Sequence, residues 1–145
     1  MHSMKVILHN CFVIKKAYDS LWDQIMERFE LTRAEIDVLA FISANPELNT
    51  AHEVVEYRMI AKSHVSKAVD HLIEIGFLMR EQDKNDRRCI HLNITDKAKE
   101  AVAAIREKQL EFSGRLVEGF SERELEMIRE TTTKVAKNAE EATIN

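Results

Sequence analysis

The chain has 145 residues, of which 45% are hydrophobic and 32% charged, and its formal net charge is −4. This balance supports a folded domain with a core and a polar surface, and it excludes an intrinsically disordered chain. No apolar run reaches the roughly 18 residues of a membrane span, and two cysteines do not make a disulfide framework. We therefore expect one domain over residues 1–145, located in the cytoplasm and without a membrane partner.

The first predicted element is a helix over residues 6–29, whose apolar residues recur at steps of three and four. The members of this stripe are Cys11, Ile14, Tyr18, Leu21, Ile25 and Phe29. Phe12, Trp22 and Met26 widen the stripe, so the helix needs packing partners on more than one side.

Two shorter helices follow, and a capping box opens each of them. In this motif a Thr side chain and a Glu side chain three residues later satisfy the first free backbone N–H groups of the helix. Thr32 and Glu35 form the first box, and Thr50 and Glu53 form the second, after Asn45-Pro46 has ended the earlier helix. The residues predicted to face the core are Ile36, Leu39, Ile42, Val54, Val55 and Tyr57.

The next helix ends at Gly76 and combines a buried side with a polar side. Val65, Val69 and Leu72 recur at helical spacing, with Ala68 beside them, and are predicted to face inward. A helix, a short break and a second helix of this length form the helix-turn-helix pattern.

A β-hairpin is predicted directly after Gly76. Ile90, Leu92 and Ile94 alternate with Cys89, His91 and Asn93, the pattern of a half-buried strand. Residues 77–82 form its expected antiparallel partner, and the charged turn 83–88 joins the two. The fold class predicted is therefore mainly α with a small β-wing, a winged helix-turn-helix.

Long amphipathic helices lie at both ends of the chain. Thr95 is predicted to cap a helix that runs to about Glu118, and Ser121 with Glu124 forms a third capping box for the last helix. That helix has a seam of near-heptad spacing, formed by Leu125, Ile128, Thr132, Val135, Ala139 and Ala142. One chain of this size does not easily bury both terminal stripes, so we expect a homodimer built from the terminal helices. The alternative is that these helices fold back on their own core.

Charge is distributed unevenly along the chain. Seven basic and five acidic residues lie between Arg58 and Arg88, so this segment is net positive although the whole chain is acidic. A basic segment on an acidic body is compatible with DNA binding, although the contrast is small.

The order of these elements resembles the multiple-antibiotic-resistance regulator (MarR) family of winged-helix transcription factors. The residues that carry the resemblance are Leu31-Thr32 with Val38-Leu39, Ser63 to Lys67, Val69 to Leu72, Gly76, Asp83 to Arg88, and Leu92 to Thr95. It is close over about residues 30–110 and extends to the terminal helices in pattern only. One departure is Ala61, where the family often has a capping Ser or Asp.

The resemblance implies a sequence-specific transcriptional regulator that acts as a homodimer on double-stranded DNA at a pseudo-palindromic operator. In this arrangement residues 31–96 form the DNA-binding lobe, and residues 1–30 and 97–145 form the dimerisation helices. It also implies a repressor that a small aromatic or phenolic effector releases from DNA, with no cofactor. Neither the effector nor the residues that bind it follow from the sequence.

DNA contacts are expected from the polar side of the recognition helix, because the N-terminal half of such a helix reaches base edges in the major groove. We expect Ser63, His64 and Lys67 to contact bases, and Lys62 and Ser66 to contact phosphates or mixed positions. The alternative is an ordinary solvated helix face.

The wing supplies two further candidates, Arg87 and Arg88. One is expected to enter the minor groove, where negative potential favours arginine. The other is expected to pair with an acid such as Asp86 and to order the turn. The alternative is a generic run of surface charge.

Other functions have weaker support. The six histidines are scattered and show no metal-ligand spacing, so no metal site is predicted, and a metal-sensing variant remains an alternative. Cys11 is predicted to be a buried structural residue, with a peroxide-sensing thiol as the alternative. No catalytic motif occurs, so the chain is not expected to be an enzyme. A winged-helix adaptor that binds protein instead of DNA is the rival from another class.

Overall fold

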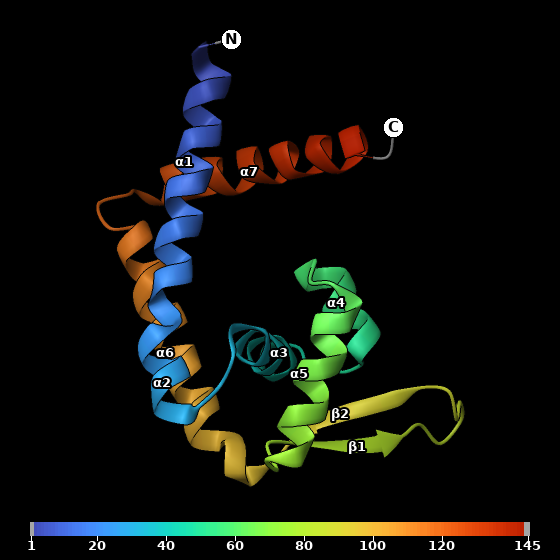
Figure 1. Cartoon of the computed structure of the whole chain (residues 1–145). Coiled ribbons are helices and arrows are strands. Elements are labelled where there is room, and N and C mark those ends of the chain that lie inside the picture. The colour runs from blue at the N-terminus through green and yellow to red at the C-terminus, as the bar shows by residue number, and fades with distance from the viewer. Residues whose placement is uncertain (1, 144–145) are drawn as a thin grey trace. The chain divides into compact units, whose positions relative to one another are not determined.

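The computed structural model describes residues 2–143, and the chain divides into two compact units, residues 1–109 and 110–145 (Figure 1). The elements in chain order are α1 (His2–Asp19), a 3-10 turn (Ser20–Trp22), α2 (Asp23–Phe29), α3 (Arg33–Ala44), α4 (Ala51–Arg58), α5 (Lys62–Glu74), β1 (Leu78–Gln82), β2 (Ile90–Ile94), a 3-10 turn (Asp96–Ala98), α6 (Lys99–Leu116) and α7 (Glu122–Thr143). The architecture is mainly helical with one two-stranded sheet, as predicted. The expectation of a single domain remains a prediction.

The first predicted helix is interrupted. The α1 helix ends at Asp19, a 3-10 turn follows, and α2 ends where Glu30 adopts a left-handed backbone conformation with φ of 54°. The hydroxyl of Ser20 donates to the carbonyl of Ala17 at 2.7 Å, a local bond that competes with regular helical pairing. Trp22, within the turn, is fully buried in the core.

The α3 helix lies at the centre of the core, and six of its apolar residues are buried. Both predicted capping boxes are present: the Thr32 and Thr50 hydroxyls accept from the backbone N–H groups of Glu35 and Glu53. The prediction of Tyr57 as a core residue was wrong. Its side chain is 61% exposed and stacks on the ring of Phe41, at 5.8 Å between ring centroids.

The start of α5 lacks a side-chain cap, because the N-cap residue is Ala61, whose methyl group cannot accept a hydrogen bond. We expect Ala61→Ser to raise the free energy of unfolding by about 1 kcal/mol, since a serine oxygen accepts one of the free N–H groups of the first turn. Urea denaturation at one protein concentration measures the change.

The matched control for this substitution is Ala103→Ser, at an exposed interior position of α6. Serine has lower helix propensity than alanine, so this variant should be slightly less stable than the wild type. Equal effects of the two substitutions would contradict the capping argument.

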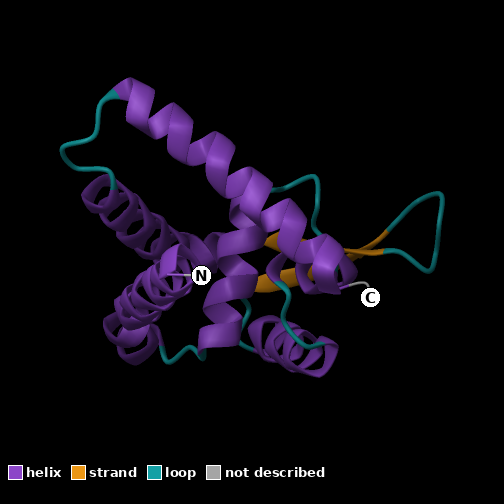
Figure 2. Ribbon diagram, turned by 90° about the horizontal axis from the view of Figure 1, so that it is seen from above, coloured by secondary structure: helices purple, strands orange, loops and turns teal. Residues whose placement is uncertain are grey.

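The β-wing pairs β1 with β2 in antiparallel register, with Leu78 opposite Ile94 and Gln82 opposite Ile90. Buried Leu78 and Leu92 anchor this hairpin to the core. The backbone N–H of Leu92 also donates to the carbonyl of Asn49, at 2.7 Å, so the wing is attached to the loop between α3 and α4. Figure 2 shows the hairpin extending beyond the helices of the first unit, with its turn at the far end.

The predicted cap at Thr95 was wrong. Its side chain makes no capping bond; instead its hydroxyl donates to the carbonyl of Gly76, which has φ of 81°. A 3-10 turn therefore precedes α6. The capping box of Ser121 and Glu124 is confirmed, because the Ser121 hydroxyl accepts from the Glu124 N–H.

The terminal helices expose much of their apolar surface. The larger exposed apolar side chains are Met4, Val6, Ile7, Leu8, Phe12, Val13 and Ile14 in α1, and Met127, Ile128 and Val135 in α7. Cys11 is exposed as well, so its prediction as a buried residue was wrong for the single chain. None of the helices in the described range 2–143 is sufficiently long and apolar to cross a membrane.

Candidate nucleic-acid interface

The α5 helix presents one polar face to solvent. Its opposite face is fixed in the core by Val65, Ala68, Val69 and Leu72, each at most 4% exposed. This anchoring leaves all five helix residues predicted to contact DNA exposed: Lys62, Ser63, His64, Ser66 and Lys67. The structure therefore brings them together on one surface at the N-terminal part of the helix.

Two polar contacts fix the orientation of α5. Nδ1 of His71 lies 2.6 Å from Oε1 of Glu35, a carboxylate that is only 3% exposed. The other oxygen of Glu35 accepts from the N–H of Thr32 at 2.9 Å, so α5 is attached to the start of α3. At the wing side, Arg80 of β1 pairs with Asp70 of α5 at 2.5 Å.

Asp83 holds the wing turn. Its Oδ1 accepts from the backbone N–H groups of Asn85 and Asp86, at 2.8 and 2.9 Å. Its Oδ2 lies 2.8 Å from Nε2 of His91. The hydrogen bond from His91, followed by those from the two backbone groups, lowers the pKa of Asp83 to about 2. The side chain is therefore ionised at neutral pH and keeps these bonds.

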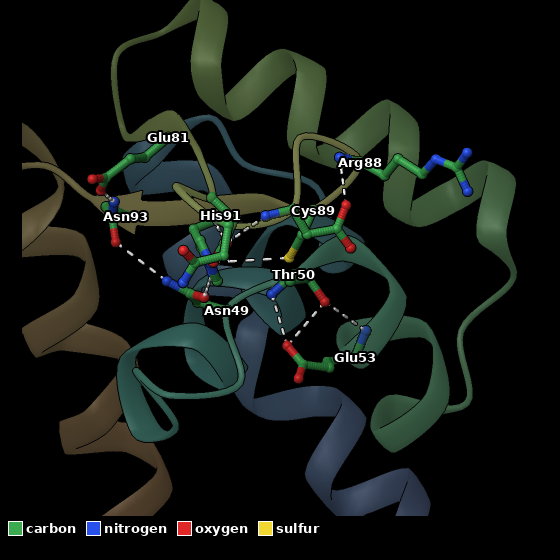
Figure 3. Close-up of polar contacts among 11 residues, drawn as sticks. Asn49, Thr50, Glu53, Glu81, Arg88, Cys89, His91 and Asn93 are labelled. Carbon is green, nitrogen blue, oxygen red and sulfur yellow. Dashed lines mark hydrogen bonds and ion pairs between the residues drawn. The ribbon is translucent and has the colours of Figure 1, made fainter.

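Asp86 acts on the turn through the backbone. Its Oδ1 accepts from the N–H of Arg88 at 3.0 Å. Within residues 2–143, no ion pair joins Asp86 to the side chain of Arg87 or Arg88, so the expected pairing is not seen. Both arginines are exposed, and Figure 3 shows the Arg88 side chain extending away from the polar cluster at the wing base.

Sequence reasoning missed the roles of Asp83 and His91. The sequence did carry a signal for His91. The alternation of side chains along β2 places His91 on the same face as Cys89, the residue just before the strand. Asp83 stands where a side chain commonly accepts from the backbone two residues later, which is a typical turn pattern.

An open cavity of about 690 Å³ lies within the first unit. Its lining residues are Lys15, Tyr18, Asp19, Arg33, Asp37, Tyr57, Arg58, Met59 and Ile60. Arg33 pairs with Asp19 at 2.9 Å and Arg58 pairs with Asp37 at 2.7 Å. Hydrogen bonds from Lys15 and Arg33 lower the pKa of Asp19. The cavity thus combines aromatic rings with guanidinium groups that are already paired with carboxylates.

Known proteins share this arrangement. The model of the MarR family matches residues 29–88, from the end of α2 to the wing turn. The solved structure of a MarR protein from Peptoclostridium difficile is 26% identical, with a TM-score of 0.78, over 94% of this chain and 88% of that one. The chain is therefore similar to MarR-family proteins, by the family model over residues 29–88 and by fold over most of its length.

The curated relatives of this chain are named as transcriptional regulators. An HTH-type transcriptional regulator of Bacillus cereus is 28% identical over 81% of this chain and 78% of its own length. The regulator PecS of Dickeya dadantii is 25% identical over 83% of this chain and 74% of its own length. A MarR-family regulator from Listeria monocytogenes, solved in complex with a 26-mer DNA, has the same fold at 24% identity, with a TM-score of 0.79 over 90% of this chain and 87% of its own. The chain is thus similar to transcriptional regulators along most of its length.

Proposed function

We propose that this chain is a transcriptional regulator that binds double-stranded DNA as a homodimer at a pseudo-palindromic operator and acts as a repressor that a small effector releases. The observation that carries the proposal is the exposed polar face of α5 together with two exposed wing arginines, Arg87 and Arg88. The Listeria relative bound to a 26-mer DNA supports the same use of the fold.

The proposed contacts divide between the two grooves. Ser63, His64 and Lys67 reach base edges in the major groove, and Lys62 and Ser66 contact phosphates or mixed positions. One or both wing arginines enter the adjacent minor groove. Asp83 and Asp86 position those arginines by holding the turn backbone, because their bonds are made to N–H groups within the turn.

The terminal helices form the proposed dimer interface. A monomer would leave seven larger apolar side chains of α1 exposed between Met4 and Ile14. Burial of such a row between two copies is favourable at about 25 cal/mol per Å². Residues 1–30 and 97–145 would then hold two lobes, residues 31–96 of each chain, one DNA turn of about 34 Å apart.

The proposed effector site is the cavity that contains Arg33 and Arg58. A ligand with an aromatic ring and a carboxylate fits this lining, because the ring packs on Tyr18 or Tyr57 and the carboxylate replaces Asp19 or Asp37 on a guanidinium. By linkage, such a ligand releases DNA only if it favours a conformation that binds DNA less well.

We expect Tyr57→Ala to weaken the release of DNA by aromatic carboxylates about fivefold, because loss of one ring contact removes roughly 1 kcal/mol. DNA affinity without ligand should stay within about twofold, since Tyr57 lies outside the DNA-binding face. Titration of the complex with a panel of benzoate derivatives measures both. An unchanged response in Tyr57→Ala would place the effector elsewhere.

The direct test of DNA binding is selection from a pool of randomised duplexes, with sequencing of the retained DNA. The proposal predicts a palindrome whose half-sites lie about 10 bp apart. A folded dimer that retains no sequence, with and without aromatic acids and zinc, would contradict the proposal and favour the adaptor function.

A further inference from the structure

The base of the wing holds a cluster of three side chains with metal-binding atoms. A carboxylate oxygen of Asp83, the sulfur of Cys89 and a ring nitrogen of His91 all lie within 4.8 Å of one another. Nε2 of His91 is 2.8 Å from Oδ2 of Asp83 and 3.9 Å from Sγ of Cys89. One nitrogen therefore faces both of the other ligand atoms.

We propose that Asp83, Cys89 and His91 bind a divalent transition-metal ion, of the zinc class, at the base of the wing. Tetrahedral zinc with ordinary bond lengths separates N from S by about 3.5 Å and N from O by about 3.3 Å. In the structure the N–S distance is longer than this, at 3.9 Å, and the N–O distance is shorter, at 2.8 Å. Side-chain rotations that shift these atoms by about half an ångström would complete the site. Water takes the fourth position.

The surroundings of His91 favour this role. Its Nδ1 lies 2.6 Å from Oδ1 of Asn49, which accepts the ring N–H (Figure 3). Asn49 is held in turn, because its Nδ2 donates to Oδ1 of Asn93, and Nδ2 of Asn93 donates to Glu81. These hydrogen bonds orient the imidazole ring so that Nε2 faces the cluster. A metal ion would replace the proton that Nε2 shares with Asp83, while Nδ1 keeps its hydrogen bond to Asn49, as in metal-binding histidines with a hydrogen-bonded second nitrogen.

The charge of the cluster also favours a cation. Oδ1 of Asp83 is used by two backbone N–H groups, which leaves Oδ2 as the ligand atom. A divalent ion would neutralise the negative charge of this carboxylate, and the thiol proton of Cys89 would pass to solvent as the metal–sulfur bond forms.

The site would connect the wing to the helix-turn-helix. Asp83 follows β1, Cys89 precedes β2 and His91 lies in β2, while Asn49 comes from the loop before α4. A bound ion would therefore restrict movement of the wing turn relative to β2 and, through His91 and Asn49, relative to the loop before α4. This consequence for DNA binding rests on the proposed function, whereas metal binding itself does not.

The test is titration of reduced, tag-free protein with Co²⁺ in the absence of DNA. We expect a thiolate-to-cobalt charge-transfer band in the near ultraviolet, which one equivalent of Zn²⁺ removes. Cys89→Ser should abolish the band, whereas the matched control Cys11→Ser, at the other cysteine, should keep it. Asn49→Ala should weaken cobalt affinity about 10- to 100-fold, as loss of a hydrogen bond to a ligand does elsewhere.

Absence of the band in the wild type, or its persistence in Cys89→Ser, would overturn the proposal. If Cys89→Ser fails to fold by circular dichroism, His91→Gln decides instead: unchanged cobalt affinity in that variant would also overturn it. Because no DNA is present, a failure of the proposed DNA-binding function would leave these results unaffected.

Discussion

Removal of both wing arginines, Arg87→Ala with Arg88→Ala, should lower DNA affinity by about two orders of magnitude. The two side chains are exposed and without ion pairs among the described residues, so their loss should not affect folding. A dimer would lose two to four contacts to DNA, and the slope of log affinity against log salt should become shallower by about 2 to 4. Fluorescence anisotropy with a labelled operator at several salt concentrations measures both quantities.

The matched control removes two other exposed arginines, Arg106 in α6 and Arg123 in α7. Because it changes net charge equally, it separates a general loss of positive charge from the loss of wing contacts. Equal losses of affinity in the two double variants would show that the wing has no special part in binding.

Phe12→Glu should convert the protein to a monomer. Phe12 is 68% exposed in the single chain and lies in the apolar row of α1. If that row is buried between subunits, the new carboxylate loses its solvation there, at a cost of several kcal/mol. Sedimentation velocity should show half the wild-type mass at micromolar concentration, and operator affinity should fall by at least about 100-fold because one half-site is lost.

Two further variants test the dimer independently. Lys16→Glu reverses a charge on the same helix without touching the apolar row, and it should remain dimeric. Ile128→Glu tests α7, where the side chain is 42% exposed. Dimers that persist in both Phe12→Glu and Ile128→Glu would show that the terminal helices are not the interface.

The helices of the winged helix-turn-helix were predictable because their signals are local. The Thr32–Glu35 and Thr50–Glu53 boxes each lie within one helical turn, and the spacing of Val65, Val69 and Leu72 alone indicates the buried side of α5. The exposure of the five α5 candidates follows from the same periodicity.

Features that depend on distant partners were not predictable. The Thr95 hydroxyl bonds to Gly76, 19 residues earlier, and does not cap α6. His91 bonds to Asn49, 42 residues earlier, so the partner that orients its ring is not indicated by any short motif, although Asp83, Cys89 and His91 themselves lie close together in the sequence. The burial of Cys11 was predicted wrongly, since the residue is exposed in the single chain. An apolar stripe indicates that a helix face needs a packing surface, but it does not show whether the same chain or a second chain provides that surface.

The salt dependence of operator binding tests the central claim most directly. Lys62, Lys67, Arg87 and Arg88 give eight positive charges on the two DNA-facing surfaces of a dimer. If each charge displaces one counterion from the DNA, whether it contacts a base, a groove or a phosphate, the slope of log affinity against log salt should be near −7. We predict a steep linear decrease for the duplex recovered by selection and weaker binding to a scrambled duplex. Affinity that is independent of salt, or equal for the two duplexes, would contradict the account.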